Sequence, residues 1–242
     1  MKCSPDEFLI CLLARMLTGV KSVATGASSP IPGAAALLAQ EQSGGRMTAM
    51  ILGSDNHGPF NDGGPELFDR AAQGRIEVFF VGGGQIDGGG NVNLVGTGPY
   101  PRATARFPGS FGIPYLYSLV PRIILFREEH SKRVLVPKVD FVTAAGTGPE
   151  GVHRTGGPYA LVTGRAVFLF DRDQRSFRLN SHHPKTSLSL IEENTGFDYL
   201  VDGDVQETPG PADDSLSLLR GTVRDQIAEI YPEFAATRLG GS

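Results

Sequence analysis

The sequence predicts an α/β fold with an open, mixed and largely parallel sheet flanked by helices. Short apolar runs alternate with helical patterns in the first third of the chain, a glycine-rich segment follows one of these runs, and β-type runs recur farther on. A β-α-β-α-β order implies parallel strands joined by right-handed crossovers. No repeat, linker or shift of composition marks a boundary, so we expect residues 1–242 to form a single domain.

The N-terminal third has recognisable helix starts and short strands. Acidic residues fall in the first turn of the helix predicted at 6–18, and Pro65 opens the one at 65–73; both features favour a helix start. The apolar runs between the helices have the length of buried strands. In chain order we expect a helix at 6–18, a strand at 22–25, a helix at 32–42, a strand at 47–52, a helix at 65–73 and a strand at 76–81.

The remaining elements are shorter. Runs rich in β-branched and aromatic residues indicate strands, and the last of them form an antiparallel series turned by residues 171–173. We expect strands at 91–95, 122–126, 134–136, 159–163, 166–170 and 175–179, and helices at 113–119, 188–194 and 213–230.

Composition limits the classes of function. The net charge is −4, whereas a surface that tracks nucleic-acid phosphates needs a basic excess. No apolar run approaches the ~20 residues of a membrane-spanning helix. The two cysteines, Cys3 and Cys11, have neither metal-binding nor redox spacing. We therefore expect a cytoplasmic protein with no metal site and no nucleic-acid or membrane partner.

The segment 82–90 contains six glycines in nine residues and directly follows the strand at 76–81. Ligands of open α/β sheets bind at the carboxyl ends of strands, and a backbone without side chains lets them approach closely. The segment contains no G-x-G-x-x-G motif, and the chain contains no G-K-[ST]. A binding loop and a plain mobile connection are the two interpretations that composition allows.

The same segment matches a longer motif. Its residues fit G-x-x-Q-[IV]-D-x-x-G-N-[LV]-N at Gly82, Gln85, Asp87, Gly90, Asn91 and Asn93. Further motifs follow in order: R-F-P-G-S-F-G at 106–112, K-R-V at 132–134, K-V-D-F-V-T at 138–143 and E-N-T-G-F at 193–197. Together, over roughly residues 8–220, the chain resembles β-type subunits of the CoA-transferase family (family I), such as that of glutaconate CoA-transferase.

This resemblance implies a CoA-transferase-like fold and a hetero-oligomer with an α-type subunit, with the active site between the two. It implies a coenzyme A thioester as substrate and no tightly bound cofactor. In the transferases a glutamate attacks the thioester, and backbone N–H groups stabilise the oxyanion. Carried over, the oxyanion and CoA-binding residues are Gly82, Gly83, Gly84 and Gln85. The substrate-binding residues are Ser54, Asn56, Gly109, Ser110, Phe111 and Gly112.

The chain departs from the family pattern at the nucleophile. Transferases have Ser-Glu-x-Gly after the second strand, whereas this chain has G-S-D-N-H-G at 53–58. Asp55 is one methylene shorter than glutamate, which retracts the carboxylate by roughly 1 Å and can cost on the order of a hundredfold in rate. We expect Asp55 and the Gly82–Gly84 turn to face one cleft.

Three functions fit this substitution. CoA transfer through Asp55 follows the family. Hydrolysis with Asp55 and His57 as catalytic residues resembles the superfamily's steroid-ring-cleaving CoA-thioester hydrolase, which has also lost the glutamate. In the third, the loop is a simple turn and the chain is a non-catalytic partner subunit. A sugar-phosphate isomerase of related fold is disfavoured, since the motifs match transferases better.

Other polar clusters are weaker candidates. His182 and His183 are adjacent on a predicted strand end, so their side chains would point to opposite faces and could not share a metal. The cluster at 128–130 is typical of a solvated strand end.

Overall fold

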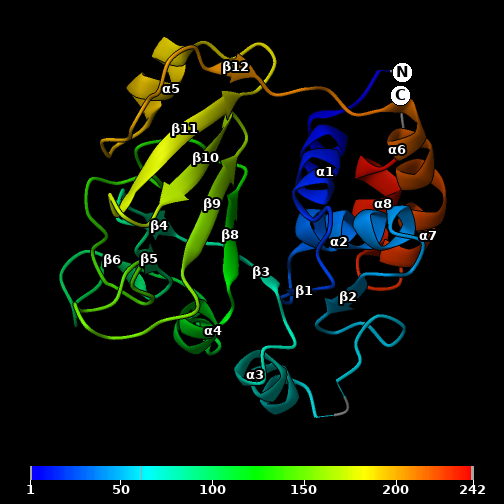
Figure 1. The fold of residues 1–242 in the computed structure, drawn as a ribbon, viewed down its shortest axis with the longest axis horizontal. Helices are drawn as coiled ribbons and strands as arrows, with labels where there is room; N and C mark the ends of the chain where they lie inside the picture. The colour runs from blue at the N-terminus through cyan, green and yellow to red at the C-terminus, as the bar shows by residue number, and fades with distance from the viewer. Residues whose placement is uncertain (1, 61, 241–242) are drawn as a thin grey trace. The chain divides into compact units, whose positions relative to one another are not determined.

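A computed structural model describes residues 2–60 and 62–240 (Figure 1). The chain folds into two compact units. Unit 1 consists of Met1–Phe80 and Pro209–Ser242, and unit 2 of Val81–Thr208.

Unit 1 is built on three parallel strands. β1 (Ser22–Thr25) lies between β2 (Thr48–Ile51) and β3 (Val78–Val81), and it is parallel to both. Nearly all residues of these strands are buried, as expected for parallel strands covered on both faces. The helices of this region are α1 (Pro5–Met16), α2 (Pro30–Gln42) and α3 (Gly64–Ala72), and each bound lies within two residues of the prediction.

The C-terminal segment of unit 1 differs from the single helix predicted at 213–230. It consists of α6 (Asp213–Leu218), a π-helical turn at Leu219–Val223 and α7 (Arg224–Ile227). Gly221, with φ −103° and ψ −105°, leaves the helical region and produces the break. A further helix, α8 (Pro232–Arg238), follows it.

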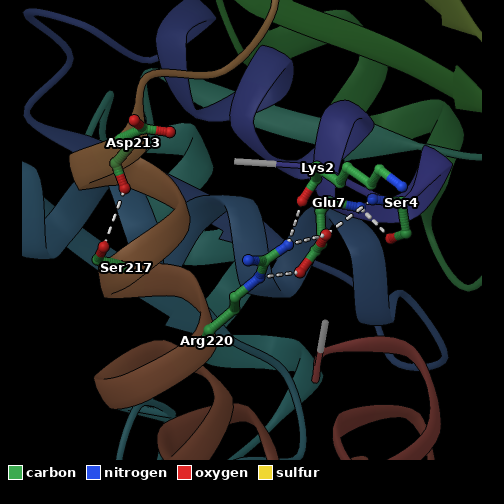
Figure 2. A network of polar contacts seen from close by, with 6 residues as sticks. All are labelled: Lys2, Ser4, Glu7, Asp213, Ser217 and Arg220. Carbon is green, nitrogen blue, oxygen red and sulfur yellow. Dashed lines mark hydrogen bonds and ion pairs between the residues drawn. The ribbon is translucent and has the colours of Figure 1, made fainter. Parts of the chain in front are cut away.

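A buried ion pair ties the start of α1 to this segment (Figure 2). Ser4 and Glu7 form a capping box, and the Glu7 side chain is only 1% exposed. Arg220 donates from Nε to Glu7 Oε1 at 2.6 Å and from Nη2 to Oε2 at 2.9 Å. The hydrogen bond from Arg220 keeps the pKa of Glu7 below its usual value, although burial opposes this.

Unit 2 contains a mixed sheet, coloured green to yellow-orange in Figure 1. Its strands are β8 (Arg122–Arg127), β9 (Pro158–Thr163), β10 (Ala166–Asp171), β11 (Ser176–His182) and β12 (Gln206–Glu207). The β8–β9 and β11–β12 pairs are parallel, whereas β10 is antiparallel to both of its neighbours. The helices are α4 (Ile113–Leu119) and α5 (Leu188–Asn194).

Two short ladders accompany this sheet. β4 (Gln85–Ile86) pairs with β5 (Val92–Asn93), and β6 (Gly96–Thr97) pairs with β7 (Ala105–Arg106). The predicted strand at 134–136 is reduced to a single bridge between Leu135 and Ile86.

Two buried histidines lie at one end of the unit 2 sheet. The expectation of a solvated cluster at 128–130 is wrong for His130, which is 5% exposed, because its ring nitrogens lie 2.8 Å from Thr163 Oγ1 and 3.0 Å from Thr195 Oγ1. His183 Nε2 lies 2.9 Å from the Thr163 carbonyl oxygen. Burial lowers the pKa of each histidine to about 4.

The predicted α/β fold with an open, mixed sheet is confirmed. Within residues 2–60 and 62–240, no helix combines the length and apolar character needed to cross a bilayer.

Replacing Glu7 by Gln is expected to lower the free energy of unfolding by about 2–3 kcal/mol. Breaking a fully buried pair costs about 3–5 kcal/mol, and Arg220 retains some contact with water. Denaturant unfolding measures the change. Asp225→Asn, which alters an exposed pair with Arg224, is the matched control and should change stability by less than about 1 kcal/mol. Equal effects of the two substitutions would contradict this role of Glu7.

The free energy of unfolding is expected to fall as the pH drops from about 6.5 to 4. In this window the unfolded chain binds protons at His130 and His183 and the folded chain does not, so protons favour unfolding. Each histidine contributes a slope of about 1.4 kcal/mol per pH unit. Denaturant unfolding at several pH values tests this. His130→Gln should flatten the profile and the exposed His153→Gln should not; an unchanged slope in His130→Gln disproves the assignment.

Candidate functional site

The loop after β2 is held by a distant glutamate. Glu229, which follows α7, accepts hydrogen bonds from Ser54 Oγ at 2.9 Å, Asp55 N at 2.7 Å and Asn56 N at 3.1 Å. The Ser54 hydroxyl also accepts from His57 N at 2.7 Å, which closes the turn. Burial alone would raise the pKa of Glu229, but the hydrogen bonds from Ser54, Asn56 and Asp55 outweigh it and lower that pKa.

The side chains of the turn differ in exposure. Ser54 is buried, Asp55 and Asn56 are exposed, and His57 is half-buried. A Cβ on Gly58 would lie 2.1 Å from the Ser54 carbonyl oxygen, so only glycine allows the chain to close so tightly. The loop therefore holds an exposed carboxylate and an imidazole on a fixed backbone beyond the carboxyl end of β2, as general acid–base or nucleophilic chemistry requires.

Sequence reasoning missed Glu229. It lies 174 residues from Asp55 and belongs to no motif, so only the packing of the C-terminal segment of unit 1 reveals it. A glutamate side chain thus lies beside the loop although the loop has none of its own. Its role is structural, because both carboxylate oxygens of Glu229 accept hydrogen bonds from the loop.

The glycines at 82–84 differ in their surroundings. Gly82 is exposed, Gly83 is buried, and the Gly84 amide donates to the Asn93 carbonyl at 3.0 Å. A Cβ on Gly84 would lie 2.2 Å from the ring of Phe107, so glycine is needed there for packing. Of these three backbones, Gly82 is the one that solvent reaches most.

The polar residues of the motif face inward and hold the loop together. Asp87 Oδ1 accepts from the backbone N–H groups of Gly89 and Asn91, each at 3.1 Å, and Oδ2 accepts from Val139 N at 3.3 Å. The Asn91 side chain donates to both oxygens of Asp87, and its own oxygen accepts from Gly146 N at 3.0 Å. Buried backbone groups need such partners, and a glycine-rich loop has few regular ones.

Gln85 belongs to the same framework. It is 6% exposed; its Oε1 accepts from Asn93 Nδ2 at 2.7 Å and from Asp140 N at 3.0 Å, and its Nε2 donates to Asp140 Oδ2 at 3.1 Å. Contact with a substrate would require these bonds to be exchanged.

The predicted substrate loop lies before α4. Gly112 caps this helix in the left-handed region, at φ 70°, and Phe111, also at positive φ, is 60% exposed. Gly109 is exposed, Ser110 is half-buried, and the Ser110 carbonyl accepts from Ile113 N. An exposed aromatic ring on a fixed turn is a suitable contact for an apolar group.

The structure describes the Ser54–His57 loop within unit 1 and the Gly82–Gln85 and Gly109–Gly112 segments within unit 2. A common cleft for Asp55 and Gly82–Gly84 stays a prediction. No group of three or more His, Cys, Asp or Glu side chains with metal-binding geometry is found in the described part of the chain.

The chain is similar to several known proteins. The model of the family described as coenzyme A transferase matches residues 7–194. The B-type subunit of glutaconate CoA-transferase from Acidaminococcus fermentans is 37% identical over 143 residues, which are 56% of this chain and 53% of that protein. The cholesterol ring-cleaving hydrolase IpdB subunit of Rhodococcus jostii is 31% identical over 159 residues, 64% of this chain and 62% of that one.

The chain thus spans between a half and two thirds of the length of these curated relatives. The structural match is more extensive. A crystal structure of the decarboxylase AibA/AibB superposes with a TM-score of 0.79 and 26% identity, covering 99% of this chain and all of that one.

Glu229→Gln is expected to loosen the Ser54–His57 turn. The amide has one acceptor oxygen, whereas the carboxylate now receives hydrogen bonds on both. Amide hydrogen exchange at Asp55 and Asn56 should accelerate roughly fivefold, for a loss of about 1 kcal/mol at this solvent-accessible position. The exposed Glu233→Gln serves as control. Unchanged exchange rates in Glu229→Gln would show that Glu229 does not hold this turn in place.

Proposed function

The chain belongs to the coenzyme A transferase family, and we propose that it is the β-type subunit of an enzyme acting on an acyl-CoA thioester. The reaction is transfer of CoA between carboxylic acids. One observation carries the proposal: an exposed Asp55 carboxylate stands on a braced turn after β2, where the motif of the transferases has its glutamate.

In this reaction an Asp55 oxygen attacks the thioester carbonyl carbon and the CoA thiolate leaves, which gives a mixed anhydride. The thiolate then attacks the Asp55 carbonyl carbon, releasing the first carboxylic acid as its carboxylate and leaving CoA on the enzyme as a thioester. An acceptor carboxylate then attacks the enzyme thioester, which forms a second mixed anhydride and releases the CoA thiolate. The thiolate attacks the acyl carbon of the acceptor, so the acceptor leaves as its CoA thioester and the Asp55 carboxylate is regenerated. We assign oxyanion stabilisation to the backbone of Gly82–Gly84, with Gln85 supporting that turn, and acyl-group contacts to Gly109–Gly112.

Hydrolysis is the second candidate, favoured by the shortened carboxylate. A retracted Asp55 leaves room for a water molecule between itself and the carbonyl carbon, and Asp55 or the neighbouring His57 would take the proton from that water. The relative named as a ring-cleaving hydrolase subunit supports this alternative. In a third alternative the chain is a non-catalytic partner and the loop is only a turn.

We propose that the partner of this chain is an α-type subunit. We also propose that units 1 and 2 together make up one β-type domain. A relative whose name marks it as one of several transferase subunits, and a two-component decarboxylase, support the partner. The family match runs from unit 1 into unit 2, which supports their treatment as one domain. Cys3 and Cys11 form no disulfide, in keeping with the proposed cytoplasmic location.

Asp55→Ala, in the complex with the co-expressed α-type partner, is expected to reduce acyl-CoA turnover by on the order of a hundredfold or more. The exposed Asp62→Ala is the control. Identifying the products, whether a new acyl-CoA, a free acid or carbon dioxide, shows which reaction takes place. If Asp55→Ala kept full activity with every accepted thioester, both catalytic roles of Asp55 would be excluded and only the non-catalytic alternative would remain.

Asp55→Glu separates the two main candidates. Restoring the longer side chain should preserve or raise transfer but impair hydrolysis, because it fills the space assigned to water. Borohydride or hydroxylamine should trap enzyme-bound CoA thioester at residue 55 in transfer only. Hydrolysis without any trapped adduct would remove the transferase proposal.

A further inference from the structure

A small pocket in unit 2 brings together two arginines and four glycines. It has a volume of about 150 Å³, and its lining includes Gly146, Gly148, Gly156, Gly157, Arg154 and Arg172. No acidic side chain contributes to the lining. Typical sites for whole small molecules measure about 300–1,000 Å³, so this pocket suits a single small group.

The two arginines are held in place by backbone carbonyls. Arg154 donates from Nη1 to Ala145 O at 2.9 Å and from Nη2 to Tyr117 O at 3.2 Å. Arg172 donates from Nη2 to Pro121 O at 3.1 Å. The Nε of Arg154 is buried and has no hydrogen-bond partner among the residues that the structure describes.

The charges of these guanidinium groups are uncompensated within the described residues, where neither forms an ion pair with a carboxylate. Burial is the main cause that lowers the pKa of Arg154; Tyr117 opposes this, and the positive charge of Arg172 lowers the pKa of Arg154 further. Holding like charges together is unfavourable, and an anion between them removes the cost.

The glycines let the backbone reach the arginines. A Cβ on Gly148 would lie 3.0 Å from Arg154 Cδ. Gly157 has φ 135°, and a Cβ there would lie 3.9 Å from Arg172 Nη2. The pocket floor is therefore bare main chain at the points where a ligand would approach the guanidinium groups.

The glycine-rich loop packs against the segment that lines this pocket. A Cβ on Gly146 would lie 1.9 Å from the Gly89 carbonyl oxygen, and Gly146 N donates to Asn91. Tyr117 donates its hydroxyl to the Gly90 carbonyl at 2.6 Å, and its own carbonyl accepts from Arg154. The framework of Asp87 and Asn91 thus extends to the pocket wall.

We propose that this pocket, defined by Arg154 and Arg172 over the glycines at 146–157, binds a phosphate group. Two guanidinium groups match the negative charge of a phosphate, and the planar fork of a guanidinium can donate to two phosphate oxygens; the volume admits one such group. The group comes either from free phosphate or from the nucleotide part of a larger molecule such as coenzyme A. The binding itself does not depend on the proposed reaction.

Calorimetric titration of the full chain with inorganic phosphate, at constant ionic strength, tests the proposal. Arg172→Gln should weaken phosphate binding about tenfold, because it removes one charge-assisted contact. Arg172 is exposed, so its substitution should not lower the melting temperature without phosphate. Arg175→Gln removes a positive charge from the same exposed hairpin turn without altering the pocket lining, and should bind as the unmodified chain does.

Titration with adenosine 3′,5′-bisphosphate distinguishes the two sources. Tighter binding than phosphate, weakened by Arg172→Gln, assigns the site to a nucleotide phosphate; equal or weaker binding assigns it to the free ion. No binding of either probe, or equal binding by Arg172→Gln and Arg175→Gln, overturns the proposal. Since no turnover is measured, either result leaves the proposed acyl-CoA chemistry to its own test.

Discussion

The buried carboxylate of Asp87 is the group on which the glycine-rich loop depends. A loop with six glycines in nine residues has a flexible backbone and few regular partners for its N–H groups. Asp87 accepts from the N–H groups of Gly89 and Asn91 and also from that of Val139, and so joins the loop to the segment that follows Lys138. Without this acceptor, several donors would be buried unsatisfied. The exposed position of Gly82 and the carbonyl of Gly90 that Tyr117 contacts both follow from the fixed path.

Unit 1 uses the same physical solution with a different residue. Glu229 accepts from the backbone of Asp55 and Asn56 and from the hydroxyl of Ser54. In both units a carboxylate organises the main chain of a loop: Asp87 from within its own loop, and Glu229 from a segment distant in the chain. The motif residues Gln85, Asp87 and Asn91 therefore define the shape of one loop, and Glu229 defines the shape of the Ser54–His57 turn.

The backbone of Asp55 holds the turn while its side chain is exposed, and this explains how the chain can depart from the transferase pattern. Exchanging glutamate for Asp55 changes the reach of one exposed side chain, but Asp55 contributes its backbone N–H to Glu229, and that contact does not depend on side-chain length. The fold can therefore accept the substitution at little structural cost. Relatives named as a transferase subunit, a hydrolase subunit and a decarboxylase show that members of this fold carry different reactions.

The sequence by itself determined the α/β class, the order and approximate bounds of the N-terminal elements, and the motifs that resemble the family, because these depend on local periodicity and spacing. It also marked Asp55 and the glycine-rich loop. It did not reveal the break at Gly221, where the backbone leaves the helical region. It could not reveal the burial of His130 between Thr163 and Thr195, or the hydrogen bonds from the Ser54–His57 loop to Glu229, because these depend on residues distant in the chain. Only tertiary packing decided that the polar motif residues face inward and that Arg154 and Arg172 share one pocket.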